Sequence, residues 1–462
     1  MEKTLRENKM GTAPVGRLLV GMAVPMMISM LVQAFYNVVD SVFVSQLSEN
    51  ALNAVSLAFP LQNIMIAFGG GTALGMNAIL SRFLGEKNFE DANRAANTGI
   101  FLTIITSLVC MIIGIFLTRP FFNLLTDVRE IVGYGTSYGS ICLIFSFGIF
   151  SQFCFERLLQ STGKTTLSMV TQLIGAITNI VLDPIFIFHK GQALFGGAFH
   201  MPFGLGLEVA GAAWATVIGQ IVAAIVAIIL NVTVNREIKI SLKLIRPDRE
   251  IVGRIYKIGF PSILMQSVGS IMTFSLNKIL IGFSTTATAV FGAYFKLQSF
   301  IFMPVFGLNN GMIPIISYNT GAKKIDRVKK TIALAITLAM SIMACGTLLF
   351  ELCPQTLLGF FNASGEMLAI GNTALRIIAT HFVIAGFCII VNSVCQAIGN
   401  PMHSLFISIC RQLLVLIPAA YLLSRTGILN MVWLAFPIAE IASLILCLIF
   451  FKKTINKIHA EE

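Results

Sequence analysis

The sequence predicts an all-α, polytopic membrane protein of 12 transmembrane helices, built as two six-helix lobes related by a parallel internal repeat. Its composition is the first reason: 56% of the residues are hydrophobic and only 11% are charged, against roughly 25% charged in soluble domains. The second is that apolar runs of about 20 residues, long enough to cross a hydrocarbon core about 30 Å thick, recur along the whole chain. The third is that the second half repeats the pattern of the first.

The apolar runs define the predicted spans. In the first half they cover 17–46, 51–83, 94–117, 131–158, 165–188 and 208–234, and in the second half 253–283, 287–319, 328–352, 366–398, 402–424 and 429–451. Several are longer than a straight crossing needs, which predicts tilted or kinked helices. The predicted organisation is a first lobe (1–234), a basic linker (235–252), a second lobe (253–452) and a tail (453–462).

The net charge of +11 is distributed asymmetrically. Basic residues gather in the N-terminal segment, where they include Lys3 and Arg6, in the linker region and in alternate connections, whereas the opposite side carries few. The positive-inside rule then predicts that both termini and the linker are cytoplasmic. The basic surplus is therefore read as a sign of membrane topology, and no nucleic-acid partner is expected. The nine cysteines form no CxxC pair, so we expect neither a metal nor a disulfide role for them.

The two halves align without gaps over a long stretch. A constant offset of 236 residues pairs Pro25 with Pro261, Gln62 with Gln298, Gly75 with Gly311, Gln160 with Gln396 and Gly163 with Gly399. The offset falls to 219 at Trp214 and Trp433 because the first half has an insertion at about 189–207, a Gly- and Pro-containing loop. Six spans per half give both repeats the same orientation, so the axis relating them is expected to lie along the membrane normal.

Two aspartates in apolar runs mark the predicted functional site. Asp40 and Asp183 lie in the first half, and the repeat places Leu276 and Ala419 at the equivalent positions of the second. An acidic side chain at membrane depth costs roughly 2.5–3.5 kcal/mol on insertion scales and is therefore usually functional. The asymmetry predicts a coupled transporter whose ion is bound in one lobe only.

Other polar residues are predicted at the same depth, in the outer third of the first lobe. They are Tyr36, Asn37, Tyr138, Asn179 and Thr216. Oxygen donors of this kind suit a hard cation such as Na⁺, and the same two carboxylates can instead carry a proton. The alternative is a hydrogen-bonded network that only holds helices together. Because Pro184 follows Asp183, we also expect a local break in the fifth span.

Further intramembrane residues have two interpretations each. Pro25 and Pro261 lie early in the first helix of each lobe, where each is either a bending point or a fixed kink. Lys296 is either a cavity residue or an ion-pair partner. Arg411 and Glu440 fall at similar depths in the last two spans, which predicts a structural charge pair.

The chain resembles the multidrug and toxic compound extrusion (MATE) transporters, and within them the DinF-like branch of bacterial exporters. The resemblance covers nearly the whole chain. It depends on the duplicated architecture, on YNVVDSVFVSQL around Asp40, on the Gln160–Lys164 loop with its counterpart Gln396–Pro401, and on NIVLDP around Asp183. It implies two lobes in a V arrangement with a central cavity, and a first-lobe ion site at Asp40, Tyr138, Asn179, Asp183 and Thr216.

The resemblance implies export of drugs and organic cations across a bacterial cell membrane, in exchange for inward Na⁺ or H⁺, by a monomer without other cofactors. An adaptable apolar cavity is expected from the 20 methionines and 37 phenylalanines. Its candidate lining residues are Gln33, Met65, Met265, Gln266, Lys296 and Met303. One alternative is a flippase for lipid-linked oligosaccharides, which would need a more basic cleft. An intramembrane enzyme is not expected, because no HExxH or Ser/His constellation is present.

Overall fold

The computed structural model describes residues 8–194, 199–361 and 364–460. Part of the predicted N-terminal positive charge, at Lys3 and Arg6, lies outside the described residues, as do 195–198 of the inserted loop and the last two residues of the tail. The described chain is helical apart from one short hairpin and its connections, which confirms the predicted all-α class.

The chain divides into two compact units. The first comprises Met1–Met27, Ser81–Lys87 and Leu264–Glu462, and the second comprises Ile28–Leu80 and Asn88–Ile263. The chain therefore passes between the units four times, three times inside a helix and once between Lys87 and Asn88. Two of the three helices contain Pro25 and Pro261. These units do not follow the predicted lobes, whose boundaries at 234, 252 and 452 stay a prediction.

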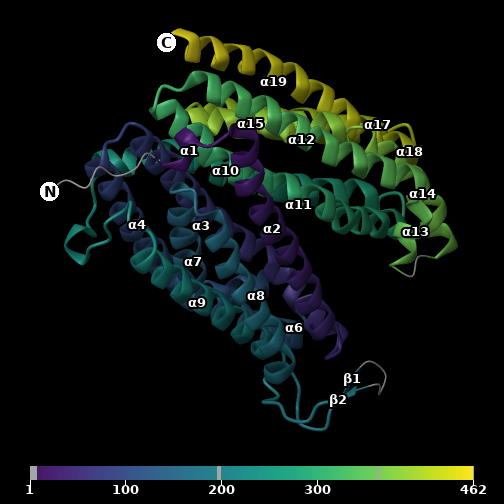
Figure 1. The fold of residues 1–462 in the computed structure, drawn as a ribbon. Helices are drawn as coiled ribbons and strands as arrows, with labels where there is room; N and C mark the ends of the chain where they lie inside the picture. Colours follow the sequence, from purple (N-terminus) through teal and green to yellow (C-terminus); the bar gives the residue numbers. More distant parts are fainter. Residues whose placement is uncertain (1–7, 195–198, 362–363, 461–462) are drawn as a thin grey trace. The chain divides into compact units, whose positions relative to one another are not determined.

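The second unit contains most of the helices from the first half of the chain (Figure 1). Its elements are the later part of α2 (Val15–Ser45), most of α3 (Glu49–Gly85), α4 (Phe89–Phe116), α5 (Thr118–Leu125), α6 (Arg129–Ile144), α7 (Phe147–Ser161), α8 (Thr165–Ile187), α9 (Glu208–Thr233), the 3₁₀ helix η2 (Leu242–Leu244) and the start of α10 (Arg249–Ile281).

The first unit contains the second-half helices and the beginning of the chain. Its elements are α1 (Lys9–Thr12), the start of α2, the end of α3, the later part of α10, α11 (Thr285–Gly321), α12 (Ile325–Leu352), α13 (Pro354–Gly359), α14 (Gly365–Ala379), α15 (Phe382–Ile398), α16 (Pro401–Ile409), the π-helix η3 (Cys410–Leu416), α17 (Ile417–Ser424), α18 (Leu429–Trp433) and α19 (Ala435–Ala460). Asn319 of α11 donates a hydrogen bond to the Met10 carbonyl oxygen at 3.0 Å, which ties α1 to this unit.

In the described chain, nine helices are long and apolar enough to span a membrane, and two bent helix pairs pass the same test together. The predicted single spans 131–158 and 366–398 are these pairs, α6 with α7 bent by 43° and α14 with α15 bent by 48°. The remaining predicted span, 253–283, lies in α10. Its polar and charged residues keep it below the hydropathy of the others.

Two glycines allow α8 and α9 to pack backbone against backbone within the second unit. A side chain on Gly219 would place its first carbon 2.7 Å from the Gly175 carbonyl oxygen and 3.1 Å from Cβ of Asn179. Neither helix can carry a larger residue here without moving away. This contact fixes α9 against the stretch of α8 that carries Asn179 and Asp183.

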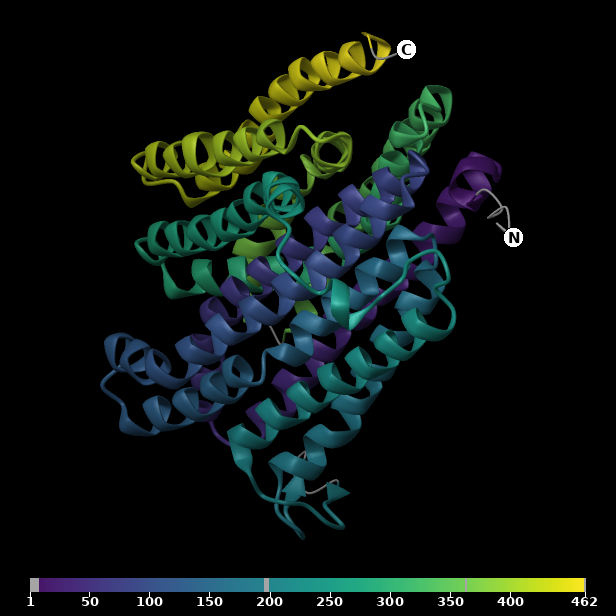
Figure 2. The same cartoon turned by 90° about the vertical axis from the view of Figure 1, so that its left-hand side faces the viewer.

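The insertion that distinguishes the first half from the second contains a small hairpin. Strands β1 (Ala193–Leu194) and β2 (Phe199–His200) pair antiparallel, with Ala193 opposite His200. The hairpin lies beyond the end of α8, at the far end of the helices of this unit (Figure 2). The sequence predicts a loop here, and the structure shows a short pair of strands within that loop, which the sequence does not predict.

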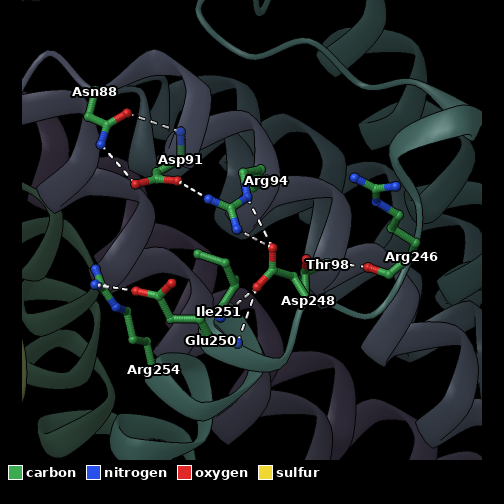
Figure 3. Close-up of polar contacts among 9 residues, drawn as sticks. All are labelled: Asn88, Asp91, Arg94, Thr98, Arg246, Asp248, Glu250, Ile251 and Arg254. Atoms are coloured by element: carbon green, nitrogen blue, oxygen red, sulfur yellow. Dashed lines mark hydrogen bonds and ion pairs between the residues drawn. The ribbon is translucent and has the colours of Figure 1, made fainter.

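The linker between α9 and α10 is fastened to the start of α4. Asn93 accepts a hydrogen bond from the Lys239 backbone N–H at 2.7 Å, and Asn97 donates to the Lys239 carbonyl oxygen at 2.9 Å. Arg94 of α4 forms an ion pair with Asp248 and another with Asp91 (Figure 3). Asp248 also accepts hydrogen bonds from the backbone N–H groups of Glu250 and Ile251, so it caps the N-terminus of α10.

Asp248→Ala is expected to lower the free energy of unfolding by about 1 kcal/mol, because it removes the cap of α10 together with the ion pair. Asp248→Asn is the matched variant, since the amide oxygen keeps the cap and only the ion pair is lost, an effect of about 0–1 kcal/mol at an exposed site. Thermal unfolding of the detergent-solubilised protein measures both. Equal losses in the two variants would show that the cap contributes nothing.

The same pair predicts a pH dependence. The hydrogen bond from Arg94 holds the pKa of Asp248 below its ordinary value of 3.8. The stability contributed by the carboxylate is thus present above that value and is lost as the pH falls through the lowered pKa. Below pH 3.8 the free energy of unfolding of the wild type should therefore approach that of Asp248→Asn, which has no carboxylate at this position.

Candidate cation-binding site

The two aspartates of the apolar helices both belong to the second unit. Asp40 lies on the last third of α2, where its residue is 8% exposed, and Asp183 lies near the end of α8, where it is fully buried. The two carboxylates are within electrostatic reach of each other. In the described part of the chain, neither of them takes part in an ion pair.

Asn179 connects Asp183 to the neighbouring helix. Its side-chain Nδ2 donates to Oδ1 of Asp183 at 3.4 Å, one turn further along α8, and to Oγ1 of Thr216 on α9 at 3.3 Å. This link is short enough only because Gly175 and Gly219 let the two helices approach closely. Because both contacts use the amide nitrogen, the Asn179 amide oxygen is left for another partner.

Two tyrosines interact electrostatically with the carboxylates. Tyr36, one turn before Asp40 on α2, is within electrostatic reach of both aspartates, and Tyr138 of α6 is within reach of Asp40. Gln62 of α3 donates to the Tyr138 hydroxyl at 3.2 Å and so orients it. Gln62 is not among the predicted site residues, although it is a polar residue inside a span with a glutamine at the equivalent position, Gln298.

Three buried oxygens of this cluster have no hydrogen-bond partner among the described residues. They are Oδ1 of Asp40, Oδ2 of Asp183 and Oδ1 of Asn179. A buried carboxylate oxygen without a partner is costly, so the cluster is suited to accept either a proton or a hard cation that prefers oxygen donors. Among the described residues, no group of three or more His, Cys, Asp and Glu could hold a metal ion. Any cation here would therefore need the amide, hydroxyl or phenol oxygens as well.

Two details of the predicted site differ from the structure. Asn37 is exposed, and the hydrogen bonds of the described residues do not join its side chain to the cluster, although the three-residue spacing keeps it near the face of α2 that carries Asp40. The helix break expected before Pro184 is absent from the described α8, which continues through the proline to Ile187. The missing proline N–H removes one hydrogen bond without ending the helix.

The second-half candidates lie in the first unit. Nη1 of Arg411 is 3.3 Å from Oε2 of Glu440, and the Glu440 side chain is only 4% exposed. Arg411 belongs to the π-helix η3, an uncommon geometry that is often found at functional positions. His381 stacks on Phe436 at a centroid distance of 5.9 Å and is within electrostatic reach of the pair.

The predicted cavity residues have diverse surroundings. Gln33 accepts a hydrogen bond from Gln172 at 3.2 Å in the second unit, where Met65 is buried in an apolar cluster with Leu143 and Phe150. In the first unit, Gln266 and Lys296 are exposed, Met303 is half-buried, and Sδ of Met265 is 3.9 Å from Nε2 of Gln396. Their role in substrate binding stays a prediction, and so does bending at Pro25 and Pro261, which lie inside α2 and α10.

Known proteins resemble the chain over nearly its whole length. The multidrug export protein MepA of Staphylococcus saprophyticus is 27% identical over 414 residues, covering 89% of this chain and 88% of that protein. MepA of Staphylococcus aureus strain MSSA476 is 24% identical over 424 residues, covering 91% and 90%. Among solved structures, an outward-facing multidrug resistance MATE family transporter of the MOP superfamily has a TM-score of 0.91 at 26% identity, and MATE in complex with MaL6 has 0.89 at 25%. Both comparisons cover 99% of this chain and 100% of the other.

The family model MatE matches the chain twice, at residues 25–185 and 261–422. The two matches begin at Pro25 and Pro261, the positions that the internal repeat pairs, and together they cover more than half of the chain. The first match contains Asp40, Asn179 and Asp183. The chain therefore belongs to the MatE family.

Proposed function

We propose that the protein is a multidrug efflux transporter that exchanges inward Na⁺ or H⁺ for outward organic, cationic amphiphiles by alternating access. Membership of the MatE family and the likeness to proteins named as multidrug exporters support transport over enzymatic activity. The proposal places the protein as a monomer in a bacterial cell membrane, with both termini in the cytoplasm.

The observation that carries the proposal is the pair of buried carboxylates without a counter-cation. Asp40 and Asp183 are close enough to repel each other when both are ionised, and three oxygens of their cluster lack partners. A proton or a Na⁺ ion relieves both penalties, so occupancy of the cluster follows the ion gradient. The repeat gives the second half Leu276 and Ala419 at these positions, and a single site in the first half is therefore proposed.

The donor set is compatible with either ion. Carboxylate, amide, hydroxyl and phenol oxygens from Asp40, Asn179, Asp183, Thr216 and Tyr138 could surround Na⁺, and one carboxyl group alone could hold a proton. At 100 mV, one net inward charge per transport cycle supplies roughly 2.3 kcal/mol. That energy is proposed to drive the change of state that exports the drug.

Reconstitution separates the two ions. Proteoliposomes are expected to accumulate a fluorescent organic cation when an outward Na⁺ gradient or an outward proton gradient is imposed alone, and to stop when that gradient is collapsed by an ionophore. Liposomes without protein serve as the control. Accumulation that continues at the same rate with both gradients collapsed would exclude ion coupling.

A further inference from the structure

The linker between α9 and α10 is rich in basic residues, and each of its three acidic residues forms an ion pair. Glu237 forms an ion pair with Lys164 at 3.3 Å, Asp248 pairs with Arg94 of α4, and Glu250 pairs with Arg254. Lys164 and Arg94 come from outside the linker, so two of its three acids are paired without using its own bases. More of the linker's basic side chains are therefore left unpaired than its composition alone indicates.

Six basic side chains between residues 236 and 257 are exposed and take part in no ion pair of the described chain. They form what we call the basic linker surface: Arg236, Lys239, Lys243, Arg246, Arg249 and Lys257. Figure 3 shows the pattern at Arg246, whose carbonyl oxygen accepts a hydrogen bond from Thr98 while its guanidinium contacts none of the residues drawn.

The backbone of the linker is held so that these side chains remain outside. Asn93 and Asn97 of α4 bind the backbone of Lys239, and Asn97 also accepts from the Ser241 N–H at 3.1 Å. Ile238 is buried beneath this stretch, 6% exposed. By contrast Leu244, next to Lys243 in η2, is 39% exposed. An apolar side chain between cations is suited to the boundary between headgroups and acyl chains.

We propose that the basic linker surface binds the headgroups of anionic phospholipids. The linker begins directly after the apolar α9, whose candidate span ends at Thr233, so its residues lie where headgroups are found. Clusters of four to eight Lys and Arg next to a membrane span attract anionic lipid, by about 1 kcal/mol for each residue near the surface. Arginines add hydrogen bonds in a geometry that matches phosphate. The inference goes beyond drug export and does not depend on which ion is coupled.

Binding of phosphatidylglycerol to the purified full-length protein, measured by native mass spectrometry against phosphatidylcholine, tests this proposal. The variant combines Lys239→Gln, Lys243→Gln, Arg246→Gln and Arg249→Gln. Its apparent affinity for phosphatidylglycerol is expected to fall at least about tenfold, since each basic residue contributes roughly a fivefold factor. Binding of phosphatidylcholine should not change.

The matched control removes the same charge from exposed lysines of the other unit: Lys323→Gln, Lys330→Gln, Lys452→Gln and Lys453→Gln. It should lose much less affinity for phosphatidylglycerol than the linker variant loses. The proposal is overturned if the linker variant keeps wild-type affinity, or if the control loses as much affinity, which would indicate a general effect of net charge. If thermal unfolding shows that the fourfold variant is misfolded, Lys243→Gln with Arg246→Gln must show a smaller fall in the same direction.

Discussion

Replacing both buried carboxylates, by Asp40→Asn together with Asp183→Asn, is expected to abolish ion-driven export while the protein still folds. The amides keep the size and the hydrogen-bonding capacity of the aspartates but bind neither a proton nor Na⁺ with useful affinity at neutral pH. One net inward charge per transport cycle at 100 mV sustains roughly a 50-fold drug gradient, and this accumulation should disappear. Removing two uncompensated buried charges should leave the thermal unfolding temperature unchanged or raised.

The measurement is accumulation of a fluorescent organic cation in proteoliposomes under the imposed gradient. Asp127→Asn is the matched control, because Asp127 is an exposed aspartate of the same unit and its loss removes a charge without touching the cluster. Full accumulation in the double variant would contradict the proposed site. Each single variant should be impaired too, since the two carboxylates act on one another.

Gly219→Leu is expected to disrupt the site from a residue that touches no ion. The new side chain would collide with the Gly175 carbonyl oxygen, 2.7 Å from its first carbon, and force α9 away from α8. Overpacking of this kind costs about 1–3 kcal/mol. Separation of the helices would also break the 3.3 Å contact between Asn179 and Thr216, so export should be lost together with stability.

Thermal unfolding and gradient-driven accumulation, measured on the same preparation, test this second prediction. Gly133→Leu is the control, because Gly133 lies on α6 of the same unit and a side chain there would meet nothing within 4 Å. It should be close to wild type in both assays. Normal export by Gly219→Leu would show that the spacing of α8 and α9 does not define the site.

Most of the fold and much of the cluster could be predicted from the sequence, because the position of a residue within an apolar span gives its depth in the membrane. An apolar run fixes where a span enters and leaves, so Asp40, Asp183, Asn179, Thr216 and Tyr138 could be placed at one level. Depth does not fix the direction in which a side chain points. Asn37 shares the predicted depth of the cluster but is exposed. Gln62 donates a hydrogen bond to Tyr138, but the sequence does not show which face of α3 is turned toward the cluster.

The details that could not be predicted depend on neighbouring helices. The 43° and 48° bends divide spans whose hydropathy is continuous, and no residue pattern marks η3 as a π-helix. At Pro184 the sequence predicts a break that the structure does not have. A proline in a packed helix removes one hydrogen bond, and the neighbouring helices hold the rest of the helix in place. In each case tertiary packing decides between two backbone geometries that the local sequence allows.

Because each compact unit contains segments from both halves of the chain, a gene divided in the linker would split both units. A cut in the linker would separate residues 1–234 from 253–462, yet the second unit runs on to Ile263 and the first unit includes Met1–Met27 and Ser81–Lys87. Neither fragment would contain a whole unit. The glycine pair at Gly71 and Gly259, where a side chain on either would come within 3 Å of the other's carbonyl oxygen, would have to form between two separate polypeptides. The two halves repeat one another in sequence, but a split version of this transporter would work only as an obligate pair of fragments, each supplying a helix that the other lacks.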